Sequence, residues 1–262
     1  MKKIKILIFA FWVLILISGD LFAIGTNQNV IEKGVSLNAE YSSSIQIFTD
    51  KKALNINVYN WTIDNMGNSI IFQDKPFTGD WLKIPAYVEK KDASANFIEI
   101  PYTVKITSSK QIEYLGKIMI SEVADDKDQG INIAMGLGIP IYVWLNNEIN
   151  LNKKSCGITK IDYNAKTQLL RVLVSNNANV HIRPQIDFKI EKTSSSILKK
   201  KPAKLINLTS SWPVLAKDQR WFTQKIVLTS GTYKIHFIIS FGKEYNLEFK
   251  KEIIKTLMVK GQ

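Results

Sequence analysis

The chain has 262 residues, of which 45% are hydrophobic and 22% are charged, and its formal net charge at pH 7 is +12. Its single cysteine, Cys156, excludes an intramolecular disulfide, so hydrophobic cores must stabilise the fold, and a chain of this length can form one or two of them. The positive charges are spread along the chain and no nucleic-acid-binding motif is present, which argues against a nucleic-acid partner.

The first 23 residues have the pattern of a secretory signal peptide. Three lysines precede an apolar run over residues 6–17, and the segment ends at a small residue, Ala23. The run is short for a membrane span, and no longer apolar run follows it. We expect residues 1–23 to be removed and the mature protein to be exported to the periplasm, with no membrane insertion after cleavage. An uncleaved N-terminal anchor is the alternative.

Alternation of apolar and polar side chains then predicts a series of short strands separated by turns. In the first half these segments are 34–40, 53–61, 70–72, 81–89, 97–106 and 114–121. The sequence between the second and third of them, Asn65–Ser69, is a turn signal.

Residues 130–145 are the most informative segment, because they are apolar at every second position. The row is Ile131, Ile133, Met135, Leu137, Ile139, Ile141 and Val143. Successive strand side chains face opposite ways, so this is a strand with one continuous hydrophobic row; its glycines and Pro140 favour an edge strand or a bulge. Two interpretations stay open: a core-facing last strand of a β-domain, or a strand that lends its row to a partner by β-augmentation.

A polar bridge over residues 146–156 separates this strand from a second half with the same style. Its predicted strands are 168–175, 180–191, 220–228, 233–241 and 245–254. Short strands with turns every 8–12 residues are typical of immunoglobulin-like sandwiches. The predicted fold class is therefore all-β, with two tandem immunoglobulin-like β-sandwiches after an N-terminal signal peptide. The predicted division is a signal peptide at 1–23, a first domain at 24–147 and a second at 148–262.

No residue pattern points to catalysis, a cofactor or a metal. The two histidines, His181 and His236, lie in predicted strands and are read as structural residues, and Cys156 alone cannot complete a metal site. Gly136-Leu137-Gly138 is inside a strand and opens no helix, so it is no dinucleotide loop. The acidic run 125–128 is read as a solvated hairpin loop, with calcium binding as the alternative. We therefore expect no enzymatic activity.

The order of several segments resembles the PapD-like periplasmic chaperones of pilus assembly. In the first half the segments are GVSL (34–37), VYNW (58–61), WLKIP (81–85), IEIPYTVKI (98–106) and IPIYV (139–143). In the second half, LRVLVSNNANVHIRP (170–184) and SGTYKIHFIISFGKEY (230–245) resemble the asparagine turn and a later hairpin of that family. The likeness covers nearly all of the chain after residue 23.

This resemblance implies a mechanism. Two immunoglobulin-like domains meet in a boomerang, and the last strand of the first domain completes the incomplete sandwich of a secreted subunit. Here that role would belong to Ile133, Met135, Leu137 and Ile139, with Ile131 and Ile141 continuing the client-binding strand. Main-chain hydrogen bonds would supply the pairing and the apolar row would set its register.

The resemblance also implies two cations that this chain lacks. Family members hold the subunit's terminal carboxylate with an arginine of the first strand and a lysine of the last. Residues 38–40 contain no basic side chain, and Pro140 stands at the lysine position. The substitutes suggested by the sequence are Lys33, Lys51, Lys52 and Lys105.

The expected function is that of a non-enzymatic periplasmic chaperone. Its partner would be an exported pilin-like or surface subunit, and the edge strand would also allow self-association. The main alternative is a structural or adhesive envelope module of two β-sandwiches. A weaker one is a protein that binds a small ligand between its domains.

Overall fold

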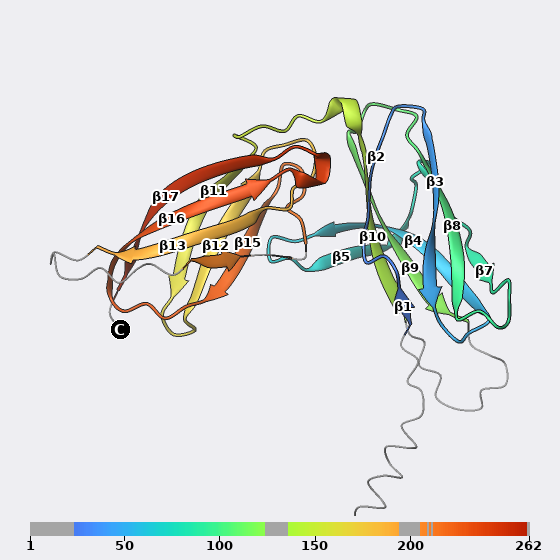
Figure 1. Ribbon diagram of the computed structural model, residues 1–262, viewed down its shortest axis with the longest axis horizontal. Coiled ribbons are helices and arrows are strands. Elements are labelled where there is room, and N and C mark those ends of the chain that lie inside the picture. The colour runs from blue at the N-terminus through green and yellow to red at the C-terminus, as the bar shows by residue number, and fades with distance from the viewer. Residues whose placement is uncertain (1–23, 124–135, 194–204, 209, 211, 261–262) are drawn as a thin grey trace, which may run out of the picture.

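The computed structural model describes residues 24–123, 136–193, 205–208, 210 and 212–260. Within these ranges the regular structure is strand, apart from two short 3-10 helices, η1 (Asn146–Glu148) and η2 (Lys243–Tyr245). The strands form two β-sandwiches that meet at an angle (Figure 1). The predicted all-β class with two tandem sandwiches is therefore confirmed. No helix in the described part of the chain has the length and hydropathy of a membrane span.

The first sandwich consists of two sheets. One has the strand order β1-β3-β8-β6, and the other has the order β2-β10-β9-β4-β5 with β7 paired to β4. The strands are β1 (Gly25–Thr26), β2 (Ile31–Val35), β3 (Glu40–Phe48), β4 (Ala53–Ile63), β5 (Ser69–Pro76), β6 (Leu82–Lys83), β7 (Tyr87–Glu89), β8 (Phe97–Lys105), β9 (Glu113–Glu122) and β10 (Gly136–Leu145).

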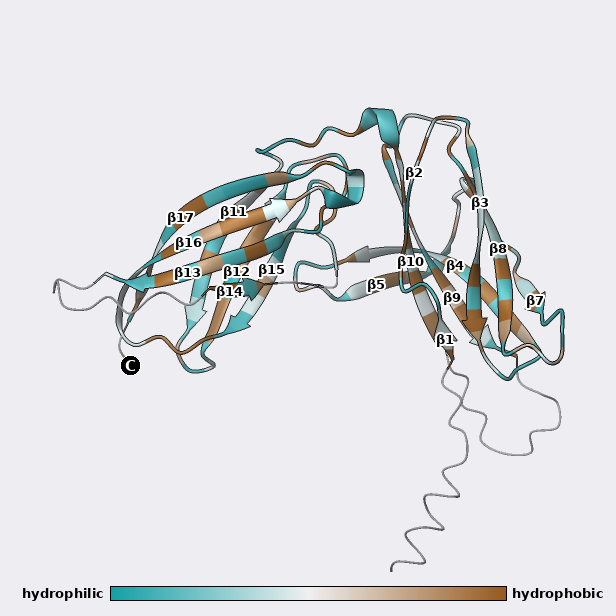
Figure 2. Ribbon diagram, in the orientation of Figure 1, coloured by the Kyte–Doolittle hydropathy of each residue, from teal (hydrophilic) through white to brown (hydrophobic). Residues whose placement is uncertain are grey.

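Alternation along these strands produces the first core, as Figure 2 shows by the alternating colours of β8 and its neighbours. Ile98, Ile100 and Val104 of β8 face Ile118 and Ile120 of β9 across the sandwich, and all five are buried. Burying one such side chain stabilises the fold by about 1.5–3 kcal/mol, so this repeated row determines which face of each strand points inward.

The second sandwich also has two sheets, β11-β12-β15 and β14-β13-β16-β17. The strands are β11 (Cys156–Asn164), β12 (Leu169–Asn176), β13 (Gln185–Lys192), β14 (Ile206–Leu208), β15 (Gln219–Lys225), β16 (Gly231–Phe241) and β17 (Phe249–Val259). Phe188 and Phe237 are packed in its core, with ring centroids 5.6 Å apart. The first sandwich ends at Leu145 and β11 begins at Cys156, so the proposed division at residue 147 falls between them.

Several predicted strands differ from the structure. The segment 81–89 is divided into β6 and β7, which belong to different sheets. The segment 34–40 is broken between β2 and β3, because Asn38 takes a left-handed conformation with φ 63°. Residues 180–184 are not a regular strand, since Pro184 lacks an N–H and the neighbouring side chains reach toward the first sandwich. The segment 245–254 begins instead with η2, and its strand starts only at Phe249.

Candidate functional site

Strand β10 has a neighbouring strand on both sides in its second half but on only one side, among the described residues, in its first half. Along its whole length it is antiparallel to β9, from Gly136 opposite Ser121 to Trp144 opposite Glu113. On its other side, β2 pairs with it in parallel only over 141–145. Residues 136–140 therefore have no paired strand on that side among the described residues (Figure 1).

The apolar row of β10 points into the first sandwich. Ile139, Ile141 and Val143 are completely buried in its core, and Leu137 is half-buried against the same core. In this structure Ile139 and Ile141 therefore cannot contact a partner, because the alternation that makes the row continuous also directs it inward. The other predicted client-binding residues, Ile131, Ile133 and Met135, lie outside the described residues.

In the first half of β10 the opposite face carries no large side chain, and side chains of β9 lie across it at Gly138. A Cβ atom at Gly138 would be 2.7 Å from Cε of Lys117 and 2.9 Å from the sulfur of Met119. Gly138 thus marks a close approach between side chain and backbone in a strand that is otherwise regular. The sequence predicts an edge strand or a bulge from this glycine. The register with β9 is regular here, and the glycine is explained by the close approach of Lys117 and Met119.

Lys117 is the basic residue opposite Pro140 in the β9–β10 register. Only 9% of it is exposed, and its ammonium donates a hydrogen bond to Oγ of Ser69 at 2.9 Å. The same ammonium lies 5.7 Å from the ring centroid of Trp61 and 5.8 Å from that of Trp212. Burial lowers the pKa of Lys117, and no described carboxylate forms an ion pair with it.

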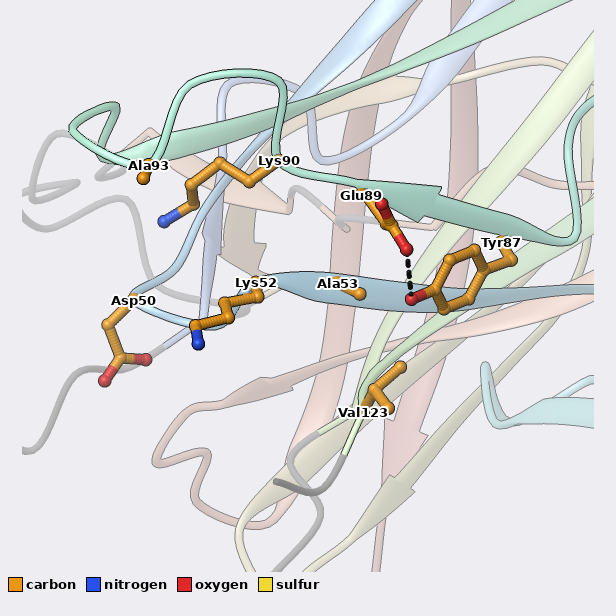
Figure 3. Close-up of a pocket in the computed structure, with 8 residues that line it drawn as sticks. All are labelled: Asp50, Lys52, Ala53, Tyr87, Glu89, Lys90, Ala93 and Val123. Atoms are coloured by element: carbon orange, nitrogen blue, oxygen red, sulfur yellow. Dashed lines mark hydrogen bonds between the residues drawn. The ribbon is translucent and has the colours of Figure 1, made fainter. Parts of the chain in front are cut away.

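The basic residues suggested by the sequence are elsewhere. Lys33 lies over the ring of Tyr41, 4.0 Å from its centroid. Lys52 lines a cavity of about 520 Å³ at the end of the first sandwich beside Val123 (Figure 3). Sequence reasoning missed Lys117 because only the strand register, and not the sequence, places it beside Pro140.

Aromatic and aliphatic side chains fill the junction between the sandwiches. Trp61, Ile63 and Tyr142 of the first sandwich pack with Leu215 and Trp212 of the second. The Trp61 ring lies 5.7 Å from that of Tyr142 and 5.6 Å from that of Trp212. The space between Ile63 and Leu215 is too small for a water molecule. The described residues thus offer no cavity here for the small ligand considered from the sequence.

A buried charged network crosses the same junction, with His181 at its centre. His181 is completely buried, and both of its ring nitrogens meet carboxylates of the first sandwich. Nδ1 contacts Oε1 of Glu113, and Nε2 lies 3.1 Å from Oε1 of Glu32. Its backbone N–H also donates to Glu113, at 2.9 Å. A neutral imidazole has only one N–H, so donation to two carboxylates requires the doubly protonated imidazolium.

The electrostatics support this protonation state. Burial alone would lower the pKa of His181, but the charges and hydrogen bonds of Glu113 and Glu32 outweigh it and raise the pKa to about 9. Glu32 also accepts a hydrogen bond from Nε of Arg183 at 2.6 Å. Burial would raise the pKa of Glu32, but its bonds to His181 and Arg183 lower it overall. The network therefore contains two carboxylates matched by two cations.

The second sandwich contributes two more groups. Oε1 of Glu244 accepts the backbone N–H of Arg183 at 2.9 Å, and burial raises the pKa of this carboxyl. The hydroxyl of Tyr245 donates to the backbone oxygen of His181 at 2.7 Å.

Asn176 fixes the loop that carries His181. Its Nδ2 donates to the carbonyls of Val180, Val214 and Leu215 at 2.8, 3.0 and 3.0 Å. Its Oδ1 accepts the N–H of Ala178 at 2.8 Å. The asparagine turn predicted from the sequence therefore closes with four hydrogen bonds and orients His181 toward the first sandwich.

The cavity beside Val123 has no histidine or cysteine and no grouped catalytic residues in its lining. It is lined by Asp50, Lys52, Tyr87, Glu89 and Lys90 together with small apolar residues, and the Tyr87 hydroxyl donates to Glu89 at 3.1 Å (Figure 3). In the described part of the chain, no three histidine, cysteine, aspartate or glutamate side chains are grouped as metal ligands.

Comparison with known proteins gives likeness in structure but not in sequence. No family model and no curated protein matches the chain. The structure of the class 5 fimbriae chaperone CfaA is 14% identical and has a TM-score of 0.50, with 89% of this chain and 98% of that chain covered. A chain from a chaperone–tip adhesin complex of CFA/I fimbriae biogenesis is 15% identical, with a TM-score of 0.51 and the same coverage. The resemblance to the PapD-like fimbrial chaperones is therefore confirmed, and this chain is a divergent example of their two-sandwich fold.

Proposed function

We propose that the protein is a non-enzymatic periplasmic chaperone that binds exported pilus-like or surface subunits by β-strand donation from the segment that leads into β10. One observation carries the proposal: among the described residues no strand pairs with the outer edge of 136–140 of β10, whereas β2 pairs with 141–145. An open edge beside an alternating apolar row is the arrangement that β-augmentation uses.

The apolar row 131–141 has two parts, one buried in the first core and one that precedes it in the chain. Ile139 and Ile141 are held in the first core and would anchor the strand. We propose that Ile131, Ile133 and Met135, with Leu137 at the border, are the side chains that a client receives. Each apolar side chain transferred from water into a client's groove contributes about 1.5–3 kcal/mol before the costs of association are subtracted. The client's own folding and hand-over would drive its release, so the mechanism needs no ATP.

Lys117 provides a cation where the resemblance calls for one. It lies opposite Pro140, and it is buried with a neutral hydroxyl and two indole rings as neighbours. A buried cation without a carboxylate partner is unfavourable, so an incoming carboxylate would gain a strong interaction there. We propose that Lys117 anchors the terminal carboxylate of the client.

Between clients, we propose that the open edge pairs with the same edge of a second copy. This would cover the exposed backbone and the apolar row, and it follows the general rule that long edge strands need protection.

The experiment is a capture of partners from the native envelope with tagged mature protein. We compare Ile133→Asp with Asn132→Asp, which places the same charge one residue away on the opposite face of the strand. Thermal unfolding confirms that both variants are folded. We expect an exported subunit with the wild type and with Asn132→Asp, and its loss with Ile133→Asp.

Equal capture by both variants would contradict strand donation. A partner recovered at fixed stoichiometry and insensitive to both changes would support the structural-module alternative instead.

A further inference from the structure

The β4–β5 hairpin connects the two sandwiches. β4 pairs with β9 only over Leu54–Tyr59, and its last residues continue past β9 with only β5 beside them. Figure 1 shows this hairpin leaving the first sandwich and reaching the second. Asp64 stabilises the tip, because its carboxylate accepts the backbone N–H groups of Met66 and Asn68 at 2.9 and 2.8 Å.

The tip of the hairpin docks on β15. The backbone N–H of Trp221 donates to the carbonyl of Asn65 at 2.8 Å, which is a main-chain hydrogen bond between the two sandwiches. Gly67, with φ 90°, lies directly against the guanidinium of Arg220, and a Cβ atom at Gly67 would be 2.6 Å from Nη2 of that residue. Glycine is required there both by the backbone conformation and by the lack of space.

The part of the hairpin next to the tip covers Lys117. Ser69, the first residue of β5, accepts its hydrogen bond, and Trp61 near the end of β4 places its ring over the ammonium. Trp212 of the second sandwich covers it from the other domain. While the tip is docked, these three side chains lie around the ammonium and only 9% of Lys117 is exposed, which restricts the access of a carboxylate.

Two kinds of contact hold the docked hairpin. Trp61 and Ile63 pack against Leu215 and Trp212, and a main-chain hydrogen bond joins the tip to β15. Closure also leaves a cation buried without a carboxylate partner among the described residues, which is unfavourable and favours opening of the tip. Local opening of such a segment does not require global unfolding.

We propose that the β4–β5 hairpin is a latch, whose tip must leave β15 before a carboxylate can bind Lys117. This rests on the proposed function, to which it adds an autoinhibitory contact: the closed latch lowers the apparent affinity of the carboxylate by the fraction of molecules that are open. Binding of a carboxylate in turn favours the open hairpin.

The first test uses Gly67→Ala, which strains the tip and pushes on Arg220. Its matched control is Gly157→Ala in the second sandwich, where a Cβ atom would meet only Oγ of Ser175 at 3.4 Å. Hydrogen exchange follows the Trp221 amide, with the other amides of β15 as internal reference. Peptide mapping follows the rate at which N-hydroxysuccinimidyl acetate acetylates Lys117. We expect both rates to rise at least about tenfold in Gly67→Ala and to stay unchanged in Gly157→Ala.

A rise at Trp221 with unchanged acetylation of Lys117 would overturn the latch, since the hairpin would then open without exposing the cation. An unchanged Trp221 amide would also overturn it.

The second test needs no variant. Exchange of the Trp221 amide in wild type is compared in sodium acetate and in sodium chloride at equal ionic strength. The latch predicts faster exchange in acetate only, and equal rates in the two salts would contradict it. Neither test uses a client, so the latch and strand donation fail separately.

Discussion

The two halves of β10 have the same alternating pattern and different surroundings. Residues 141–144 are paired on both sides, by β9 and β2, and their side chains fill the first core and the junction. Within the part of the chain that the structure describes, residues 136–140 are paired on one side only. A hydrophobic row along a strand therefore does not by itself distinguish a core strand from a donor strand. The presence of a strand on the second side makes this distinction. Here that strand is β2, and it pairs with β10 only over 141–145.

The largest effect is expected where the row is most deeply buried. Ile139→Asp would place a carboxylate in a completely apolar core, and we expect it to lower the free energy of unfolding by more than about 4 kcal/mol. Leu137→Asp, at the half-buried border, should cost about 1–2 kcal/mol. Chemical denaturation measures both. Similar losses in the free energy of unfolding for the two variants would contradict the proposed difference between the buried and the open half of β10.

The paired half also depends on the charged network beside it. Replacing His181 with alanine leaves Glu113 and Glu32 buried without their shared cation, and we expect a loss of about 3–5 kcal/mol. Calorimetry on His181→Ala and on the double variant His181→Ala with Glu113→Gln tests this. The second change removes one uncompensated charge, so the double variant should recover part of the loss. No recovery would show that the charges are not the cause.

The pH dependence follows from the same histidine. Its pKa rises from about 6.5 in the unfolded chain to about 9 in the folded protein. The folded state thus binds the proton more tightly, so the stabilisation is complete below about pH 6.5 and is lost as the pH rises through 9. We expect the free energy of unfolding to fall between pH 7 and pH 10 in wild type. The slope should be smaller in His181→Asn, and equal slopes would exclude His181 as the titrating group.

The smallest effect on stability is expected at Lys117, which lies over the open half. Lys117→Met keeps the length of the side chain and removes a buried charge that has no carboxylate partner. We expect unfolding to change by less than about 1 kcal/mol, in the stabilising direction. Denaturation measures it, and a loss of several kcal/mol would show that the ammonium is structural.

Alternation in the sequence was sufficient to predict the two sandwiches and most of their strands, because each apolar row has to face a core. Alternation was not sufficient to distinguish the half of β10 that is paired on both sides from the half that is not. That difference depends on parallel pairing with β2, more than 100 residues earlier in the chain. The contacts of His181 likewise depend on distant pairing, because its partner Glu32 is 149 residues away in the chain. The sequence does not predict the site of Lys117, because the register between β9 and β10 places it opposite Pro140. Where a residue's role is set by distant pairing, local patterns carry no signal for it.

The most direct test of strand donation is photo-crosslinking in the native envelope. A photo-reactive amino acid is placed at position 133, in the segment proposed to enter the client, or at position 139, in the buried half. The account predicts a crosslink to an exported subunit from position 133 and none from position 139. No crosslink from position 133, or equal crosslinks from both, would contradict it.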